Sequence, residues 1–200
     1  MNLPNKLTVI RIILVPFFVF FLLSNSIPHH YLAALIIFLA ASITDHYDGK
    51  IARERSLITD FGKFADPLAD KILVMSAFLC FMQLDLIGAA SIILILMREF
   101  TITSIRLVAA SGGKVISANI WGKAKTVSQM IAVIIVLILQ YINELLGMGF
   151  NVFGLNNASG DISYMFYVIG AILIWISAIL TLISGVIYIK DNKEVVNTAK

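Results

Sequence analysis

Six long apolar stretches separated by shorter polar segments dominate the pattern of this chain. About 20 mostly apolar residues in a helix span the hydrocarbon core of a bilayer, and all six stretches qualify, some of them marginally. We therefore predict an all-α integral membrane bundle of six transmembrane helices, forming a single domain over residues 1–200. The stretches are Leu7–Leu23, Tyr31–Thr44, Lys71–Leu84, Leu86–Met97 extending to Ala110, Val127–Ile142 and Tyr164–Ile189.

Composition agrees with a bilayer setting, because 60% of the residues are apolar, 14% are charged and the mean hydropathy is +0.94. These values exclude a soluble globular domain, which needs a more charged surface. A net charge of only +3 argues against nucleic acid as a partner. The single cysteine, Cys80, excludes a disulfide framework and a cysteine-rich metal site. The first stretch is read as a retained helix, since no small-x-small cleavage site follows it.

The distribution of basic residues predicts the topology. All 15 lysines and arginines lie near the two ends of the chain or between stretches two and three or stretches four and five. Segments rich in these residues stay on the cytoplasmic side of a membrane. The alternate segments carry Asp85, Glu144 and Asp161 as their charged residues. This distribution of charge predicts an even number of spans with both termini in the cytoplasm.

Four aspartates lie between the second and third stretches: Asp45, Asp48, Asp66 and Asp70. Spacings of three and four residues place each pair on one face of its own helix. Like charges gathered in one site either have raised pKa values or require cations, and two divalent metal ions are a common solution. Oxygen ligands favour magnesium, manganese or calcium over zinc. This segment is therefore the candidate centre of chemistry.

A plainer interpretation of these aspartates is helix capping. Asp66 precedes Pro67 and is a plausible N-cap, and Asp60 is another, one or two turns earlier. A helix that presents both Asp66 and Asp70 on one face must begin before Pro67, near Thr59. Acidic residues inside a membrane are costly and usually functional, so four together favour the functional reading.

Small residues accompany the aspartates. Gly49 and Ala52 on one predicted helix and Gly62 on the next leave room for close helix packing, or equally for a ligand. Arg53 adds a cation of a kind suited to a phosphate. Both uses of the space remain open at this point.

Together these residues form a long motif that resembles the signature of the CDP-alcohol phosphotransferase family at every position. The rest resembles one branch, the bacterial phosphatidylglycerophosphate synthases, through NLPNKLTVIRIILVPFF, FGKFADPLADK, REFTITSIRLVAA and WGKAKTVSQ. The resemblance covers most of residues 2–130, whereas the last stretch matches only as a hydrophobic helix. The motif reads Asp45-x-x-Asp48-Gly49-x-x-Ala52-Arg53, then eight residues, then Gly62-x-x-x-Asp66-x-x-x-Asp70.

The resemblance implies a function. Members of this branch transfer a phosphatidyl group from CDP-diacylglycerol to glycerol 3-phosphate and release CMP, in phospholipid biosynthesis at the bacterial cell membrane. It also implies a homodimer, an active site facing the cytoplasm, and two Mg²⁺ ions, with Mn²⁺ as an alternative. By similarity, Asp45, Asp48, Asp66 and Asp70 hold the metal, and Asp70 is also the catalytic general base.

The same resemblance assigns the substrate sites. CDP-diacylglycerol would lie against Gly49, Ala52 and Gly62, with Arg53 near the diphosphate.

A phosphorylated acceptor also needs cations, and the cytoplasmic segment between stretches four and five offers Arg98, Arg106, Lys123 and Lys125. Arg98 and Arg106 are about two helical turns apart and so fall near one face. The alternative is plain positive-inside signalling, with Glu99 pairing one of the cations.

Several polar and aromatic residues complete the predictions. Asn5, Thr8 and Arg11 form a polar stripe that either borders the active site or reflects Arg11 snorkelling to the headgroups. His29 and His30 are read as interfacial residues without a carboxylate partner. The predicted aromatic belts contain Trp121, Trp175 and Tyr188.

Three alternatives to this function remain open. The chain could belong to the same family but use another acceptor, such as inositol phosphate, serine or phosphatidylglycerol. It could be an aspartate-rich membrane prenyltransferase, although such clusters usually come twice. It could also be a cation transporter, but transporters place polar groups near the bilayer midplane and often contain an internal repeat.

Overall fold

The computed structural model describes residues 3–54, 60–111, 120–152 and 160–193, and leaves the side chains of 3–5, 45–54, 60–68, 70 and 111 outside that description. The described residues form six helices joined by turns, so the all-α prediction is confirmed. The helices are α1 (Leu3–Leu23), α2 (His30–Glu54), α3 (Asp60–Gln83), α4 (Ala89–Ser111), α5 (Ile120–Gly147) and α6 (Gly160–Asp191).

Each predicted apolar stretch corresponds to one helix, but several helices continue into polar sequence. Helix α2 runs past Thr44 to Glu54, and α3 starts at Asp60, well before the apolar residues that begin at Lys71. The prediction that the third helix begins before Pro67 is therefore confirmed. Both extensions carry the aspartate motif, so the motif lies on helical backbone.

Two turns show why α3 and α5 end where they do. The Leu86 N–H donates to the Phe81 carbonyl and the Asp85 N–H to the Met82 carbonyl, which is the Schellman pattern at a helix C-terminus. Asp85 adopts the left-handed φ of 55° that this turn requires. Gly149, with φ of 86°, serves the same role after α5. Helix α4 consequently begins at Ala89, later than the apolar pattern that starts at Leu86.

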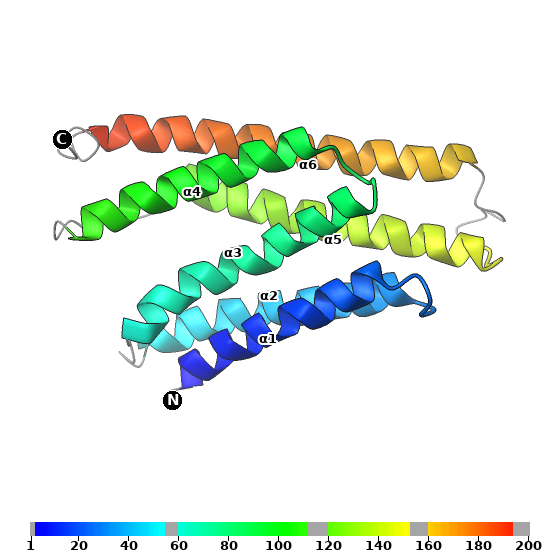
Figure 1. Cartoon of the computed structure of the whole chain (residues 1–200), viewed down its shortest axis with the longest axis horizontal. Helices are drawn as coiled ribbons and strands as arrows, with labels where there is room; N and C mark the ends of the chain where they lie inside the picture. The colour runs from blue at the N-terminus through cyan, green and yellow to red at the C-terminus, as the bar shows by residue number, and fades with distance from the viewer. Residues whose placement is uncertain (1–2, 55–59, 112–119, 153–159, 194–200) are drawn as a thin grey trace.

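The helices lie roughly along one axis, and Figure 1 shows the start of α1 and the end of α6 at the same end of the bundle. The last turns of α2 and α4 and the first turns of α3 and α5 also lie there. We call this the terminal end, and the other the opposite end. Helix α1 packs on α2 and α3, α5 packs on α6 and α2, and α4 packs on α6.

The core of the bundle is apolar and aromatic. Phe18, Phe38, Phe78 and Phe81 are fully buried where α1, α2 and α3 meet, and the Phe18 and Phe38 ring centroids lie 5.8 Å apart. Large apolar side chains, such as Trp175, are also exposed on the outer surface of the bundle. A helix that is apolar on all sides suits a membrane.

Three helices are long and apolar enough to cross a bilayer within the described part of the chain. They are α1 over Lys6–Leu23, α5 over Ile120–Gly147 and α6 over Gly160–Asp191. The apolar parts of α2 and α3, His30–Thr44 and Lys71–Gln83, are shorter. A helical membrane protein follows from these spans.

Candidate active site

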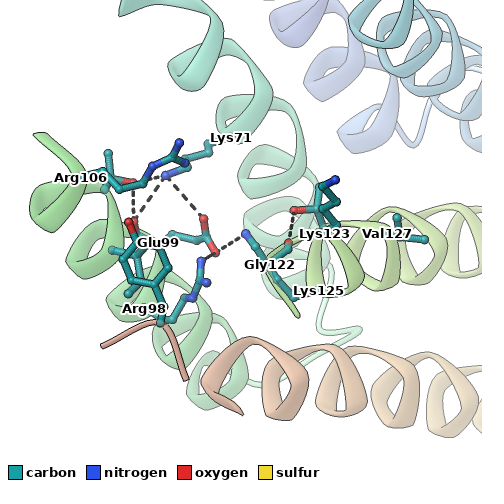
Figure 2. Close-up of a pocket in the computed structure, with 12 residues that line it drawn as sticks. Lys71, Arg98, Glu99, Arg106, Gly122, Lys123, Lys125 and Val127 are labelled. Carbon is teal, nitrogen blue, oxygen red and sulfur yellow. Dashed lines mark hydrogen bonds and ion pairs between the residues drawn. The ribbon is translucent and has the colours of Figure 1, made fainter. Parts of the chain in front are cut away.

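A cavity of about 380 Å³ opens at the terminal end between α3, α4, α5 and α6. Its volume falls within the range of about 300–1,000 Å³ that is usual for small-molecule sites. Figure 2 shows basic side chains from α3, α4 and α5 converging on it. The lining residues are Lys71, Arg98, Glu99, Ile102, Thr103, Arg106, Gly122, Lys123, Lys125, Thr126, Val127 and Tyr188.

Glu99 is the centre of the ionic contacts in this cavity, and only 4% of the residue is exposed. Its Oε1 pairs with Arg98 Nη1 at 2.9 Å and also with the Lys125 ammonium. Its Oε2 lies 3.6 Å from Lys71 Nζ. The Lys71 ammonium also donates to the Glu99 carbonyl at 3.4 Å and to the Thr103 hydroxyl. One carboxylate thereby joins α3, α4 and α5.

Arg98 extends this network to α6. Its Nη2 donates to the Ser184 hydroxyl at 2.8 Å, while its Nη1 remains on Glu99. The guanidinium is therefore held from two helices, and its side chain is only 9% exposed. Holding a planar guanidinium in one orientation favours bidentate recognition of a phosphate or carboxylate.

The cavity has a surplus of positive charge. Five of the residues that line it are cationic, and Glu99 is the one anion among them. Arg106 and Lys123 have no hydrogen-bond or ion-pair partner among the described residues, so Glu99 leaves their charge unbalanced. Clefts lined by one sign of charge concentrate ligands of the other sign. The arrangement suits a small, strongly anionic molecule.

The four basic residues predicted to bind an acceptor phosphate, Arg98, Arg106, Lys123 and Lys125, all line this cavity. The predicted pairing of Glu99 with one of them is confirmed, and it in fact pairs with Arg98 and Lys125. Contact with an acceptor stays a prediction for all four.

The aspartate motif lies on the parts of α2 and α3 that reach the terminal end. Asp45 and Asp48 are on the last turns of α2, and Asp66 and Asp70 are on the first half of α3. Their side chains are outside the described part of the chain, as are the side chains of Gly49, Ala52, Arg53 and Gly62. The metal and liponucleotide assignments therefore stay predictions. Asp70 directly precedes Lys71, which lines the cavity.

The polar stripe on α1 is buried inside the bundle. Thr8 is 0% exposed and Arg11 is 1% exposed, so the snorkelling interpretation of Arg11 is wrong. The Arg11 guanidinium is enclosed by protein and not by lipid headgroups. Of the two interpretations of the stripe, the one that remains is that it borders the active site. The Asn5 side chain lies outside the described residues.

Lys71 and Tyr188 line the cavity, although the sequence pattern predicted no functional role for either. Lys71 was noted only as a basic residue, and Tyr188 was placed in an aromatic belt. The Tyr188 prediction is wrong, because this residue is 3% exposed and lines the cavity. A signal was present: polar residues recur at helical spacing along the apolar α6. They are Ser177, Thr181, Ser184 and Tyr188.

The histidines at the opposite end also differ from expectation. The backbone N–H of His30 donates to Glu144 Oε1 at 3.3 Å, and the His30 side chain is buried. His29 Nδ1 lies 3.3 Å from the Tyr141 hydroxyl. The fold brings Glu144 of α5 to the start of α2 across 114 positions of sequence, but this carboxylate contacts the backbone of His30, and the His30 Nδ1 atom has no hydrogen-bond partner among the described residues.

Comparison with known proteins decides the family. Residues 1–183 match the family described as CDP-alcohol phosphatidyltransferase. The chain belongs to this family. The match covers α1 to α5 and α6 as far as residue 183, so it includes the cavity-lining residues of α3, α4 and α5 but ends before Tyr188.

Relatives within the CDP-alcohol phosphatidyltransferase family cover nearly the whole chain. A Bacillus subtilis protein named CDP-diacylglycerol--glycerol-3-phosphate 3-phosphatidyltransferase is 39% identical over 209 aligned residues, covering 99% of this chain and 98% of that protein. A Rickettsia felis protein of the same name is 35% identical, with 96% of each chain covered. A third protein of that name, from Haemophilus influenzae, is 39% identical over 66% of this chain and 72% of its own length.

Proposed function

We propose that this protein transfers the phosphatidyl group of CDP-diacylglycerol to glycerol 3-phosphate, giving phosphatidylglycerol phosphate and CMP in phospholipid biosynthesis. The names of its relatives support this reaction. The structural observation that carries the proposal is the cavity at the terminal end, where five cationic residues surround a space fit for a small phosphate monoester.

The charge of the cavity favours a phosphorylated acceptor over a neutral alcohol. Arg106 and Lys123 retain positive charges that no described side chain balances, and a phosphate dianion would balance both. An alcohol such as serine or free inositol would leave these cations uncompensated in a half-enclosed site, which is electrostatically costly. We therefore expect the cavity to select a phosphorylated acceptor over a neutral alcohol by its negative charge.

The reaction forms one P–O bond and breaks another. A hydroxyl oxygen of glycerol 3-phosphate attacks the phosphorus that carries the diacylglycerol, and the bond to CMP breaks. The attacking hydroxyl loses a proton, and we assign Asp70 as the base that accepts it. Asp70 lies directly before Lys71, whose ammonium is in the cavity, so the base and the acceptor site share one turn of α3.

The metal proposal rests on the chemistry of the donors. Asp45, Asp48, Asp66 and Asp70 offer only carboxylate oxygens, which fit Mg²⁺ or Mn²⁺ better than zinc. They would hold two such ions at the ends of α2 and α3 that face the terminal end. When bound, the metal neutralises the negative charge of the diphosphate.

The liponucleotide has its own proposed residues on the same two helices. Gly49 and Ala52 on α2 and Gly62 on α3 would make space for the cytidine, and Arg53 would lie near the diphosphate. The nucleotide site and the acceptor cavity would then lie on either side of the α3 carboxylates. This arrangement would bring the hydroxyl of glycerol 3-phosphate towards the phosphorus of CDP-diacylglycerol that it attacks.

We further propose that all six helices cross the bacterial cell membrane, with both termini in the cytoplasm. The start of α1 and the end of α6 lie at the terminal end, together with the basic residues of the cavity, which supports this orientation. The active site would then face the cytoplasm, where it takes one substrate from lipid and the other from water. We also propose a homodimer, on the basis of the family resemblance alone.

The test is CMP release by the purified, detergent-solubilised protein supplied with CDP-diacylglycerol and magnesium. The acceptors compared are glycerol 3-phosphate, inositol 1-phosphate, serine, phosphatidylglycerol and none, each with and without a chelator. Metal-dependent release with glycerol 3-phosphate alone is the expected result. Release with another acceptor would correct the acceptor, and no release with any acceptor would refute the reaction and reopen the prenyltransferase and transporter alternatives.

A further inference from the structure

One face of α6 is shaped around Arg98. Ser184, Gly185 and Tyr188 lie on one side of this helix because they are spaced by one, three and four residues, and each is buried. Ser184 accepts the hydrogen bond from Arg98 Nη2 at 2.8 Å. Polar side chains on an apolar, membrane-type helix are energetically costly unless they contact another group within the protein or a ligand.

Gly185 provides the space in which the Arg98 side chain lies. A Cβ atom at this position would be 2.9 Å from Arg98 Cγ and 3.5 Å from Nε. Real Cβ atoms do not approach a side chain to 2.9 Å, so any larger residue would displace Arg98. Gly185 thus allows the stem of the arginine to lie directly on the α6 backbone while its head reaches Glu99.

Tyr188 lies one turn further along α6 and lines the cavity. Only 3% of Tyr188 is exposed, yet its hydroxyl has no hydrogen-bond partner among the described residues. Buried hydroxyl groups nearly always have a partner, so an unpaired one beside a ligand cavity points to a ligand atom. Arg98 and Arg106 line the same cavity as Tyr188, and both positive charges act on its hydroxyl.

We propose that the α6 face formed by Ser184, Gly185 and Tyr188 completes the acceptor-phosphate subsite. This inference rests on the proposed function and assigns a role in acceptor binding to α6, which borders the cavity. Ser184 and Gly185 are positioning residues that hold Arg98, and the Tyr188 hydroxyl donates a hydrogen bond to an oxygen of the bound phosphate. The face therefore determines specificity for a phosphate monoester.

The first test compares two alanine substitutions in the same helix. Gly185→Ala adds a methyl group against Arg98, whereas Gly170→Ala adds one against Val136, where the contact is 3.1 Å and the cavity is remote. We expect Gly185→Ala to raise the KM for glycerol 3-phosphate about tenfold, the size of losing one good charged hydrogen bond. The KM for CDP-diacylglycerol should not change in either variant.

Two smaller substitutions test the hydroxyl groups. Ser184→Ala removes the hydrogen bond to Arg98, and Ser177→Ala removes a buried hydroxyl on the same helix outside the cavity lining. Tyr188→Phe removes only the phenol oxygen, and Tyr167→Phe is its exposed counterpart. Each cavity variant should raise the acceptor KM about fivefold, with kcat changing less than twofold, while each control stays at the wild-type value.

Binding of inorganic phosphate separates this inference from the proposed function, because it needs no turnover. Phosphate should raise the melting temperature of the wild type and of the three controls, and should raise it less in Gly185→Ala, Ser184→Ala and Tyr188→Phe. If the wild type fails to use glycerol 3-phosphate but these shifts hold, the reaction is wrong and the subsite stands. Equal phosphate shifts in cavity and control variants, or no shift in the wild type, would overturn the subsite.

Discussion

The two ends of the bundle each contain a carboxylate between helices, but they are built differently. Glu99 at the terminal end pairs with Arg98 and Lys125 and lies 3.6 Å from Lys71. Glu144 at the opposite end accepts one hydrogen bond, from the His30 backbone, and its Oε2 has no partner among the described residues. The first carboxylate organises cations around a cavity, and the second joins the start of α2 to α5.

The comparison teaches that a buried acid does not make a site by itself. What distinguishes the cavity at the terminal end is that cations outnumber Glu99, the one acid among its lining residues, around a space of about 380 Å³. Such an excess is stable only when a bound anion balances the positive charge or water solvates it. Changes at the terminal end should therefore affect catalysis, and matched changes at the opposite end should not.

The largest effect is expected from the proposed metal ligands. Asp48→Asn or Asp66→Asn should abolish CMP release, because an amide cannot supply the charge that holds a divalent cation. The proteins should still insert and purify, since both residues lie at helix ends outside the apolar spans. Asp161→Asn, in the first turn of α6 at the opposite end, is the matched control. Near-normal turnover in either Asp48 or Asp66 variant would contradict the metal site.

The next largest effect is expected at Glu99. Glu99→Gln preserves the shape but removes the charge shared by Lys71, Arg98 and Lys125, and breaking a buried ion pair such as those to Arg98 and Lys125 costs about 3–5 kcal/mol. Only part of this cost falls on the acceptor site, and we expect kcat/KM for glycerol 3-phosphate to fall about 100-fold. Steady-state kinetics with each substrate varied in turn measures the change. An unchanged kcat/KM would show that Glu99 does not organise the site.

A tenfold effect is expected from one unpaired cation. Arg106→Ala should raise the KM for glycerol 3-phosphate about tenfold through loss of a charged contact to phosphate. The KM for CDP-diacylglycerol should rise much less, and Lys190→Ala, an exposed cation on α6, should change neither value. An equal rise in both KM values would remove Arg106 from the acceptor site.

The smallest effect is expected at the opposite end. Glu144→Gln weakens one hydrogen bond of 3.3 Å to the His30 backbone, so the free energy of unfolding should fall by less than about 1.5 kcal/mol. Thermal denaturation in detergent measures this change, and the kinetics of both substrates should match the wild type. A large rise in the acceptor KM would show that the two ends are coupled, which would break the comparison.

Much of the fold could be predicted from the spacing of apolar residues. Each apolar stretch became a helix, and the need for a helix before Pro67 correctly anticipated the start of α3 at Asp60. The apolar pattern did not predict the helix ends, because local hydrogen bonds determine where a helix begins and ends. Helix α4 starts after Leu86 because the Schellman turn at Asp85 intervenes.

The acceptor cavity could be predicted in part. Arg98 and Arg106 share a face because their separation is about two turns of one helix, and both line the cavity. Tyr188 and Lys71 were missed, since their place depends on how α6 and α3 pack against α4. The partner of His30 was missed for the same reason, because Glu144 is 114 positions away.

The sequence by itself determined what is local or compositional: a helical membrane protein, the aspartate motif, and the family. These properties depend on apolar periodicity and on residues close together in the chain, and they hold in any packing of the helices. The tertiary structure alone decided that Glu99 gathers cations from three helices and that Gly185 makes room for Arg98. Such contacts join residues on different helices, and only the packing of side chains brings them within a few ångströms.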